Sequence, residues 1–183
     1  MPNILANEKE KQAKSFLQHV RQLEGAGATA IGVTSIAAHF CIDELKALSP
    51  LPIVDAVIEV REEIERKELG RVGILGTRGA MASKLFGSIA SEKAVLPQGD
   101  DLERVHNAYI GMATSGHATN EQREVVFSTG TELCRNGGAD SIVLAGTDLF
   151  LAFEGHDCGF PTIDCAVVHS EALFRSSQEG VGS

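Results

Sequence analysis

The sequence predicts an α/β fold composed of two similar halves, each with a parallel sheet. Short apolar segments alternate with helix-like ones along all 183 residues, which is the pattern of βα units. Two segments also recur: residues 27–33 (GATAIGV) return as 138–144 (GADSIVL), and 51–56 (LPIVDA) return as 160–165 (FPTIDC). The copies keep their order and stand about 110 residues apart, far more than the roughly 20–50 residues of a solenoid repeat. The repeat therefore indicates two related halves.

The first half is expected to alternate helices with short strands. Its first helix carries apolar residues at three- and four-residue steps and ends at Gly25. The apolar segment that follows is bounded by turn residues, as is typical of a buried parallel strand. Ser49-Pro50 ends the next helix, and Gly70 is the expected boundary between the halves. The predicted elements are helix 8–24, strand 28–33, helix 38–48, strand 51–54 and helix 56–68.

The second half is expected to repeat this alternation. Its first strand leads into a glycine turn, Gly76-Thr77-Arg78-Gly79, and Pro97 closes a weaker strand. The predicted elements are strand 71–75, helix 80–90, strand 94–96, helices 101–112 and 120–135, strands 141–144 and 162–163, and helix 166–176. The chain thus divides into a first half at 1–69, a second half at 70–165, and a C-terminal helix and tail at 166–183. We expect this last segment to pack back on the first half.

Composition and charge argue against a nucleic-acid or membrane partner. The net charge is −9, from 25 acidic and 16 basic residues, and no basic run interrupts it, so we expect no nucleic-acid partner. The apolar segments have the length of strands, far below the roughly 18 residues of a membrane-spanning helix. The N-terminal residues lack the pattern of a signal peptide. These features predict a cytoplasmic protein without a membrane partner.

The cysteines carry no pairing or metal-binding signature. Cys41, Cys134, Cys158 and Cys165 contain no CxxC pair. In a chain without a leader, such cysteines are interpreted as reduced thiols. The sequence therefore predicts no metal site.

The turn after the first strand of the second half is a candidate ligand site. A strand that runs into a glycine turn and then a helix exposes backbone N–H groups, which bind anions. The segment 72–78 lacks the further glycines or the Lys-Ser/Thr pair of a phosphate-binding loop, which disfavours a nucleotide. Two interpretations stay open: a carboxylate site, and a plain turn between strand and helix.

Five segments, in order, carry a family resemblance. They are residues 27–31 with Ala38-His39 downstream, 51–53, 72–81 (VGILGTRGAM), 138–148 (GADSIVLAGTD) and 160–169 (FPTIDCAVVH). With them the chain resembles the aspartate/glutamate racemase superfamily, most closely the cofactor-independent amino-acid racemases. The resemblance implies two pseudo-symmetric flavodoxin-like halves, a small carboxylate or amino acid bound between them, and no cofactor.

The resemblance also implies a mechanism whose residues this chain lacks. In the family, two cysteines flank the substrate's α-carbon; one thiolate removes its proton and the other thiol returns one to the opposite face. The first cysteine position falls on Ser35, or on Thr34 in another alignment, and the second falls on Gly146. The Asn-Thr pair that usually follows the first cysteine is Ile36-Ala37 here. We therefore expect an isomerase-family protein that has lost two-thiol racemisation.

Three functions remain open at this level. The first is a protein that binds a small carboxylate, with polar side chains at the family's cleft positions: Thr34, Ser35, Thr77, Arg78, Thr147 and Asp148. The second is a one-base isomerase or lyase that uses Cys165 or His169. The third is a non-catalytic partner of a full-length paralogue. Family members begin with a strand and a turn, and this sequence begins near the helix that follows them, so the resemblance implies an abridged first half. Either the sequence is truncated or an oligomer covers the exposed sheet edge, and we expect a homo-oligomer.

Overall fold

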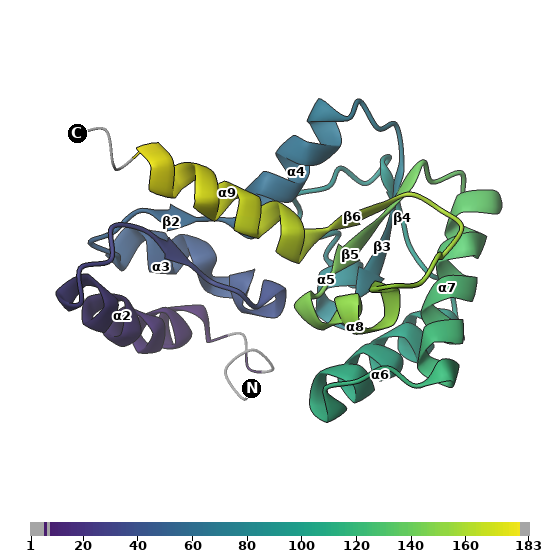
Figure 1. Cartoon of the computed structure of the whole chain (residues 1–183), viewed down its shortest axis with the longest axis horizontal. Helices are drawn as coiled ribbons and strands as arrows, with labels where there is room; N and C mark the ends of the chain where they lie inside the picture. The colour runs from purple at the N-terminus through teal and green to yellow at the C-terminus, as the bar shows by residue number, and fades with distance from the viewer. Residues whose placement is uncertain (1–5, 7, 180–183) are drawn as a thin grey trace.

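The computed structural model describes residues 6 and 8–179 and confirms the α/β fold with parallel sheets. Residues 1–5 and 7, and the expected tail at 180–183, lie outside the described residues. Figure 1 shows the chain as two groups of helices and strands that lie side by side. The strands form a two-stranded sheet in the first half and a four-stranded sheet in the second.

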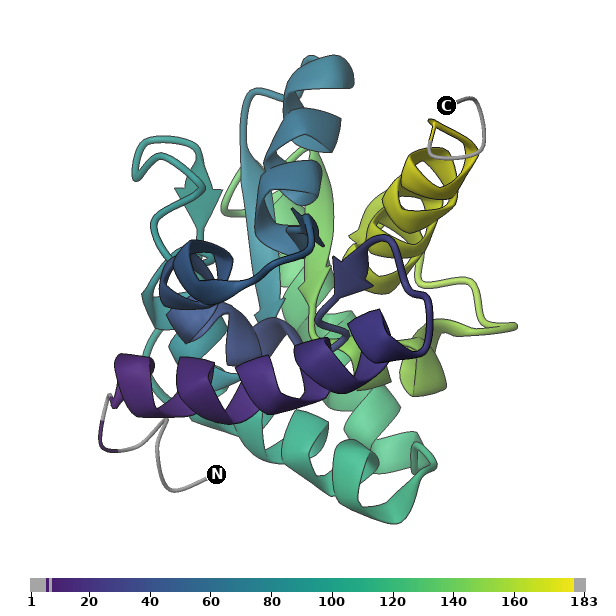
Figure 2. The same cartoon turned by 90° about the vertical axis from the view of Figure 1, so that its left-hand side faces the viewer.

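The first half contains the elements that the hydrophobic pattern predicts, with shorter strands. They are α2 (Lys9–Gly25), β1 (Ile31–Gly32), the 3₁₀ helix η1 (Ile36–Cys41), α3 (Ile42–Leu48), β2 (Ile53–Val54) and α4 (Ala56–Arg66). The α2 helix packs on α3 and η1, and Figure 2 shows it on the outer side of this half, nearest the viewer. Ala13 and Val20 on α2 join Ile31, Ile42 and Leu45 in a small core of their own.

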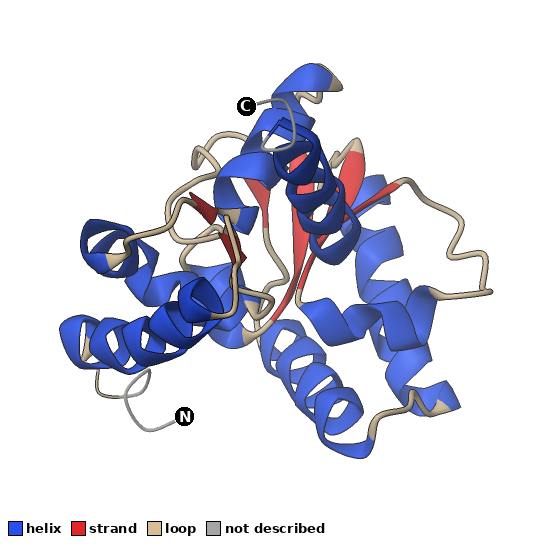
Figure 3. Ribbon diagram, turned by 60° about the vertical axis from the view of Figure 1, so that its left-hand side comes forward, coloured by secondary structure: helices blue, strands red, loops and turns tan. Residues whose placement is uncertain are grey.

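The second half contains the larger sheet, in the strand order β4-β3-β5-β6. Its elements are β3 (Val72–Gly76), α5 (Arg78–Ala82), β4 (Ala94–Val95), α6 (Asp100–Ser115), α7 (Asn120–Arg135), β5 (Ser141–Ala145), the 3₁₀ helix η2 (Thr147–Leu149), α8 (Phe150–Phe153), β6 (Thr162–Asp164) and α9 (Cys165–Glu179). All five residues of β3 and of β5 are buried, which explains their continuous apolar sequences. Helices surround these strands in Figure 3, and α6 and α7 contact β3.

The internal repeat corresponds to equivalent strand pairs. In the first half Ile31 pairs with Ile53, and in the second half Ile142 pairs with Thr162. The aspartate that ends each copy has the same local role: Asp55 accepts the backbone N–H of Val57 at the start of α4 (2.9 Å), and Asp164 accepts that of Ala166 at the start of α9 (2.7 Å). The repeat therefore encodes a strand followed by a capped helix in each half.

The expected helix over 80–90 is wrong in length. The α5 helix ends at Ala82, and the chain then enters the left-handed region at Lys84 (φ 52°), Leu85 (φ 55°), Phe86 (φ 56°) and Gly87 (φ 81°). The Ser83 hydroxyl accepts the backbone N–H of Phe86 (2.9 Å), which holds this turn, and the turn buries Leu85 in the main core. Tertiary packing therefore overrides helical propensity in this segment. The short helix α8 was not predicted from the sequence.

Two helices connect the halves. The α9 helix leaves the larger sheet and packs on α4, β1 and β2, as Figure 1 shows. Arg175 on α9 forms an ion pair with Glu59 on α4 (2.8 Å). Ile36 on η1 is buried in the same core as the residues of β3 and β5. The halves therefore share an apolar core where they meet.

Candidate functional site

The candidate site lies where neighbouring parallel strands end. Gly76 at the end of β3 pairs with Ala145 at the end of β5, so Thr77 and Gly146 leave the sheet at adjacent positions. The η1 helix, which follows β1, contacts α5, which follows β3. The segments that carry the predicted site residues of both halves thus approach one another at this edge, where open α/β sheets bind ligands.

The space beside Gly146 is filled by a side chain from another element. The backbone of Gly146 is extended (φ −174°), a conformation that any residue adopts. A Cβ atom built there would lie 2.8 Å from Cζ and 3.1 Å from the hydroxyl oxygen of Tyr109, much closer than real side chains approach. The Tyr109 ring, on α6, therefore fills the space that a side chain at residue 146 would take.

Tyr109 is a site residue that the sequence analysis missed. Its side chain is 8 % exposed, and its hydroxyl donates to Oδ2 of Asp148 (3.1 Å). Burial and the neighbouring Asp148 raise the pKa of Tyr109 to about 12, so the phenol keeps its proton at neutral pH. The signal in the sequence was that the chain's one tyrosine shares the apolar stripe of α6 with Val105 and Met112.

The predicted cysteine position in the first half carries a polar residue that is not fully buried. Ser35 is half-buried and Thr34 is exposed. The Ser35 carbonyl accepts a hydrogen bond from Nδ1 of His39 (3.0 Å), which fixes the loop after β1. Ile36, the next residue, is buried in the shared core. Its side chain has no hydrogen-bond donor to offer a carboxylate.

Thr77 and Arg78 have structural partners. The Thr77 hydroxyl oxygen accepts the backbone N–H of Ala80 (3.2 Å) and caps α5, while its own O–H remains available to donate. Arg78 forms a bidentate ion pair with Glu103 on α6, with both N–O distances at 2.5 Å. The Arg78 guanidinium thus locks the loop after β3 against α6.

His169 and Cys165 lie in packed surroundings. His169 is 4 % exposed, its Nε2 lies 2.9 Å from the carbonyl oxygen of Val54, and its ring faces Gly32 of β1. Cys165 is fully buried, and burial together with Asp164 raises the pKa of its thiol far above the ordinary value. Burial likewise raises the pKa of Cys41, with Glu44 adding to the shift.

A buried polar cluster lies beneath the first-half loop. Lys46 pairs with Oδ2 of Asp55 (2.5 Å), and Nε2 of His39 accepts the backbone N–H of Ala56 (3.3 Å). The ring of His39 meets that of His169 edge-on, with 6.2 Å between centroids. Each of these groups is engaged in holding β2, α4 and α9 together. The sequence analysis placed His39 near a helix start but gave it no partner.

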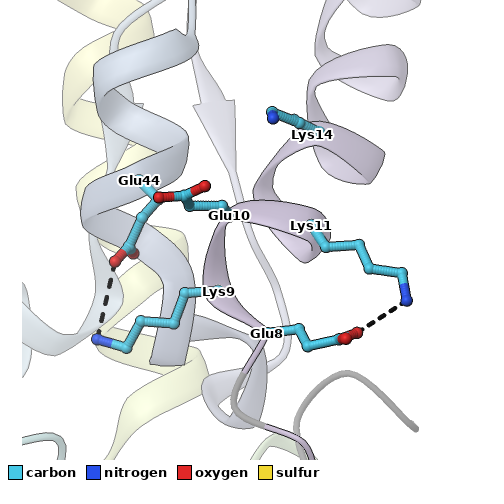
Figure 4. A pocket seen from close by; sticks show the side chains of 6 residues that line it. All are labelled: Glu8, Lys9, Glu10, Lys11, Lys14 and Glu44. Atoms are coloured by element: carbon cyan, nitrogen blue, oxygen red, sulfur yellow. Dashed lines mark hydrogen bonds and ion pairs between the residues drawn. The ribbon is translucent and has the colours of Figure 1, made fainter.

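Two cavities lie near the first-half elements. One of about 580 Å³ is lined by residues that include His39, Asp55, Arg61, Ser83 and Ser88. Another, of about 620 Å³, lies on α2 between lysines and glutamates, and Figure 4 shows its ion pairs, Lys9–Glu44 and Lys11–Glu8. This second cavity is a charged surface groove that none of the predicted site residues lines.

Within residues 6 and 8–179, His, Cys, Asp and Glu side chains form no group of three that could hold a metal ion. Over the same part of the chain, no helix has both the length and the hydrophobicity needed to cross a bilayer.

Comparisons with known proteins agree with this architecture. The chain aligns, at 26 % identity over 129 residues, with the glutamate racemase of Deinococcus radiodurans, covering 70 % of this chain and 44 % of that protein. A putative Asp/Glu racemase from Yersinia pestis superposes with a TM-score of 0.81 at 20 % identity, covering 96 % of this chain and 78 % of that one. An aspartate racemase homologue from Pyrococcus horikoshii gives 0.75 at 22 % identity, covering 90 % and 74 %.

These similarities support the fold and the family to different degrees. The two structural matches establish the fold, and the chain spans less than half of the Deinococcus enzyme. The profile of the Asp/Glu/Hydantoin racemase family, however, matches residues 2–173, which is nearly the whole chain. The expected superfamily is thereby confirmed: the chain belongs to the Asp/Glu/Hydantoin racemase family.

Proposed function

We propose that this protein binds a small carboxylate or amino acid between its two halves and does not racemise it by the two-thiol route. The observation that carries the proposal is the chemistry at the two strand ends. Ser35 stands in one position and Gly146 in the other, and the space beside Gly146 is filled by a phenol. Neither an alcohol of ordinary pKa nor a glycine can take an α-proton as a thiolate does.

The two buried thiols do not supply a substitute. Cys41 and Cys165 are fully buried, and burial keeps both protonated at neutral pH. His169 is committed to the carbonyl of Val54 and packed on Gly32. These surroundings favour binding over the one-base alternative that would use Cys165 or His169.

Hydroxyl donors support a carboxylate ligand at the edge of the larger sheet. Thr77 and Thr147 follow the paired strands β3 and β5, and both side chains are half-buried. A carboxylate between them would accept two O–H bonds once Thr147 releases the Tyr109 hydroxyl, with which its side chain is hydrogen-bonded. The net charge of −9 gives no general attraction for anions, so we expect weak binding from these local donors.

The test is removal of one donor. Thr147→Val keeps the shape of the side chain and deletes the hydroxyl, so affinity for aspartate or glutamate, measured by calorimetry, should fall about five- to tenfold. Thr114→Val, on the exposed side of α6, is the matched control and should bind as the parent does. Equal affinity of parent and Thr147→Val, with unchanged thermal stability, would place the site elsewhere.

A further inference from the structure

Tyr109 and Gly146 are a matched pair. The extended backbone of Gly146 would accept any residue, so the ring of Tyr109 is what excludes a side chain there. The ring comes from α6, which contacts η2, and its hydroxyl reaches across to Asp148. The second-half strand end is therefore closed by a side chain from a different element.

The Tyr109 hydroxyl is held by Asp148 and also by a hydrogen bond with the Thr147 side chain, and the bond to Asp148 is the one that a charged ligand can replace. Asp148 is half-buried, and no Lys, Arg or His among the described residues forms an ion pair with it. Its oxygen Oδ2 accepts only a neutral phenol, a weaker partner for a carboxylate than a cation. An ammonium group that reached this carboxylate would form the stronger, charge-assisted bond.

We propose that Tyr109 gates the second-half strand end: its ring fills the space beside Gly146 in the free chain, and the ammonium of an amino acid replaces its hydroxyl on Asp148. This inference rests on the proposed function and adds to it a residue and a ligand requirement. Displacement of the ring clears the ends of β3 and β5, where Thr77 and Thr147 meet the ligand's carboxylate. A dicarboxylate without an ammonium group has no means of displacing the phenol, so the gate selects for amino acids.

The chain is suited to a direct test because Tyr109 is its only tyrosine. Protein labelled with ¹³C at tyrosine Cζ gives one resonance, which reports the environment and hydrogen bonding of this phenol alone. The probes are aspartate and succinate, which share two carboxylates and differ by the ammonium group. Binding is measured in parallel by calorimetry.

Three variants frame the measurement. Gly146→Ala introduces the Cβ that meets the ring, so it should shift the resonance without ligand. Gly25→Ala is the matched control, since a Cβ there meets nothing within 4 Å, and it should leave the resonance at the parent position. Tyr109→Phe keeps the ring but frees Asp148, and it should bind aspartate about five- to tenfold more tightly than the parent.

The gate predicts that aspartate moves the parent resonance toward its position in Gly146→Ala and that succinate does not. Aspartate binding by calorimetry with an unmoved resonance overturns the gate and leaves the proposed function standing. Absence of binding by either probe overturns both. An equal shift with succinate overturns the ammonium requirement. An unshifted resonance in Gly146→Ala overturns the claim that the Tyr109 ring fills the space beside Gly146.

Discussion

At the scale of single residues, the equivalent aspartates of the repeat, Asp55 and Asp164, contribute differently to stability. Both cap the helix that follows, but only Asp55 also binds a lysine, Lys46, and it is 7 % exposed. Burial opposes ionisation of Asp55, and Lys46 outweighs it, so the pKa of this carboxyl lies below its usual range. Asp55 therefore contributes more than a cap.

Asp55→Ala should destabilise the protein by about 2–4 kcal/mol, because it removes a helix cap and leaves Lys46 without its partner. Asp164→Ala is the matched control, since it loses only a cap and should cost about 1 kcal/mol. The free energies of unfolding come from urea titrations. Equal losses in the two variants would show that the Lys46 pair adds nothing.

His39 predicts a dependence of stability on pH. Burial lowers the pKa of His39, and contact with His169 and Lys46 adds to this, against the opposing effect of the Ser35 carbonyl and Asp55. A lowered pKa in the folded chain means that stability is full above 6.5, the ordinary value, and is lost as the pH falls through the lowered value. His39→Gln, whose amide oxygen can accept from Ala56, should show a shallower loss of unfolding free energy below pH 6.5. Identical pH profiles would exclude His39 as the source.

Tyr109 marks the limit of sequence reasoning at this scale. Ser35 and Gly146 are predicted from motifs to occupy the family's cysteine positions, because motifs record what each position itself carries. The space beside Gly146 is filled by a residue 37 positions away on another helix. No local pattern contains that contact, since it depends on how α6 packs on η2.

At the scale of elements, helices with a clear apolar period were predicted well and strained turns were not. The helix expected at 120–135 occurs as Asn120–Arg135, with a capping box between Thr119 and Gln122. The helix expected at 80–90 stops at Ala82, because four consecutive left-handed residues follow. Left-handed conformations of residues other than glycine are costly, and they persist only where the surrounding packing stabilises them. The local sequence therefore does not predict them.

The end of α4 offers a test of such a conformation. Glu68 is exposed and left-handed (φ 53°), just after the cap residue Lys67. Glu68→Gly should stabilise the protein by about 0.5–1 kcal/mol, because glycine adopts this conformation without strain. Glu62→Gly, the same change within α4, should instead destabilise it by about 1 kcal/mol. Thermal unfolding measures both, and a loss of stability in Glu68→Gly would contradict the strain at this position.

At the scale of the whole molecule, the repeat predicted two related halves, and the structure has two equivalent strand pairs. The strand pairs do not belong to equal sheets. β5 and β6 are part of a four-stranded sheet, whereas β1 and β2 form a pair alone among the described residues. The shared core around Ile36 could not be read from the sequence, because core contacts between halves leave no periodic signal.

The small first-half sheet and the exposed face of α9 predict self-association. Val167 (52 % exposed) and Phe174 (66 % exposed) lie seven residues apart on this helix and so share one face. Sedimentation at micromolar concentration should show dimers or larger species, and replacing both residues with serine should reduce them. Leu23→Ser, on α2, is the control for loss of an exposed apolar residue. A compact monomer of the parent chain would contradict the prediction.

The central claim is that this family member binds without two-thiol racemisation, and solvent deuterium tests it most directly. D- and L-aspartate and D- and L-glutamate are incubated with the protein in deuterated buffer, and the α-proton signal is followed by NMR. Because Ser35 and Gly146 fall at the positions that we predict for the family's two thiols, we expect no exchange above the buffer rate. Exchange into both enantiomers of either amino acid, absent from heat-denatured protein, would contradict it.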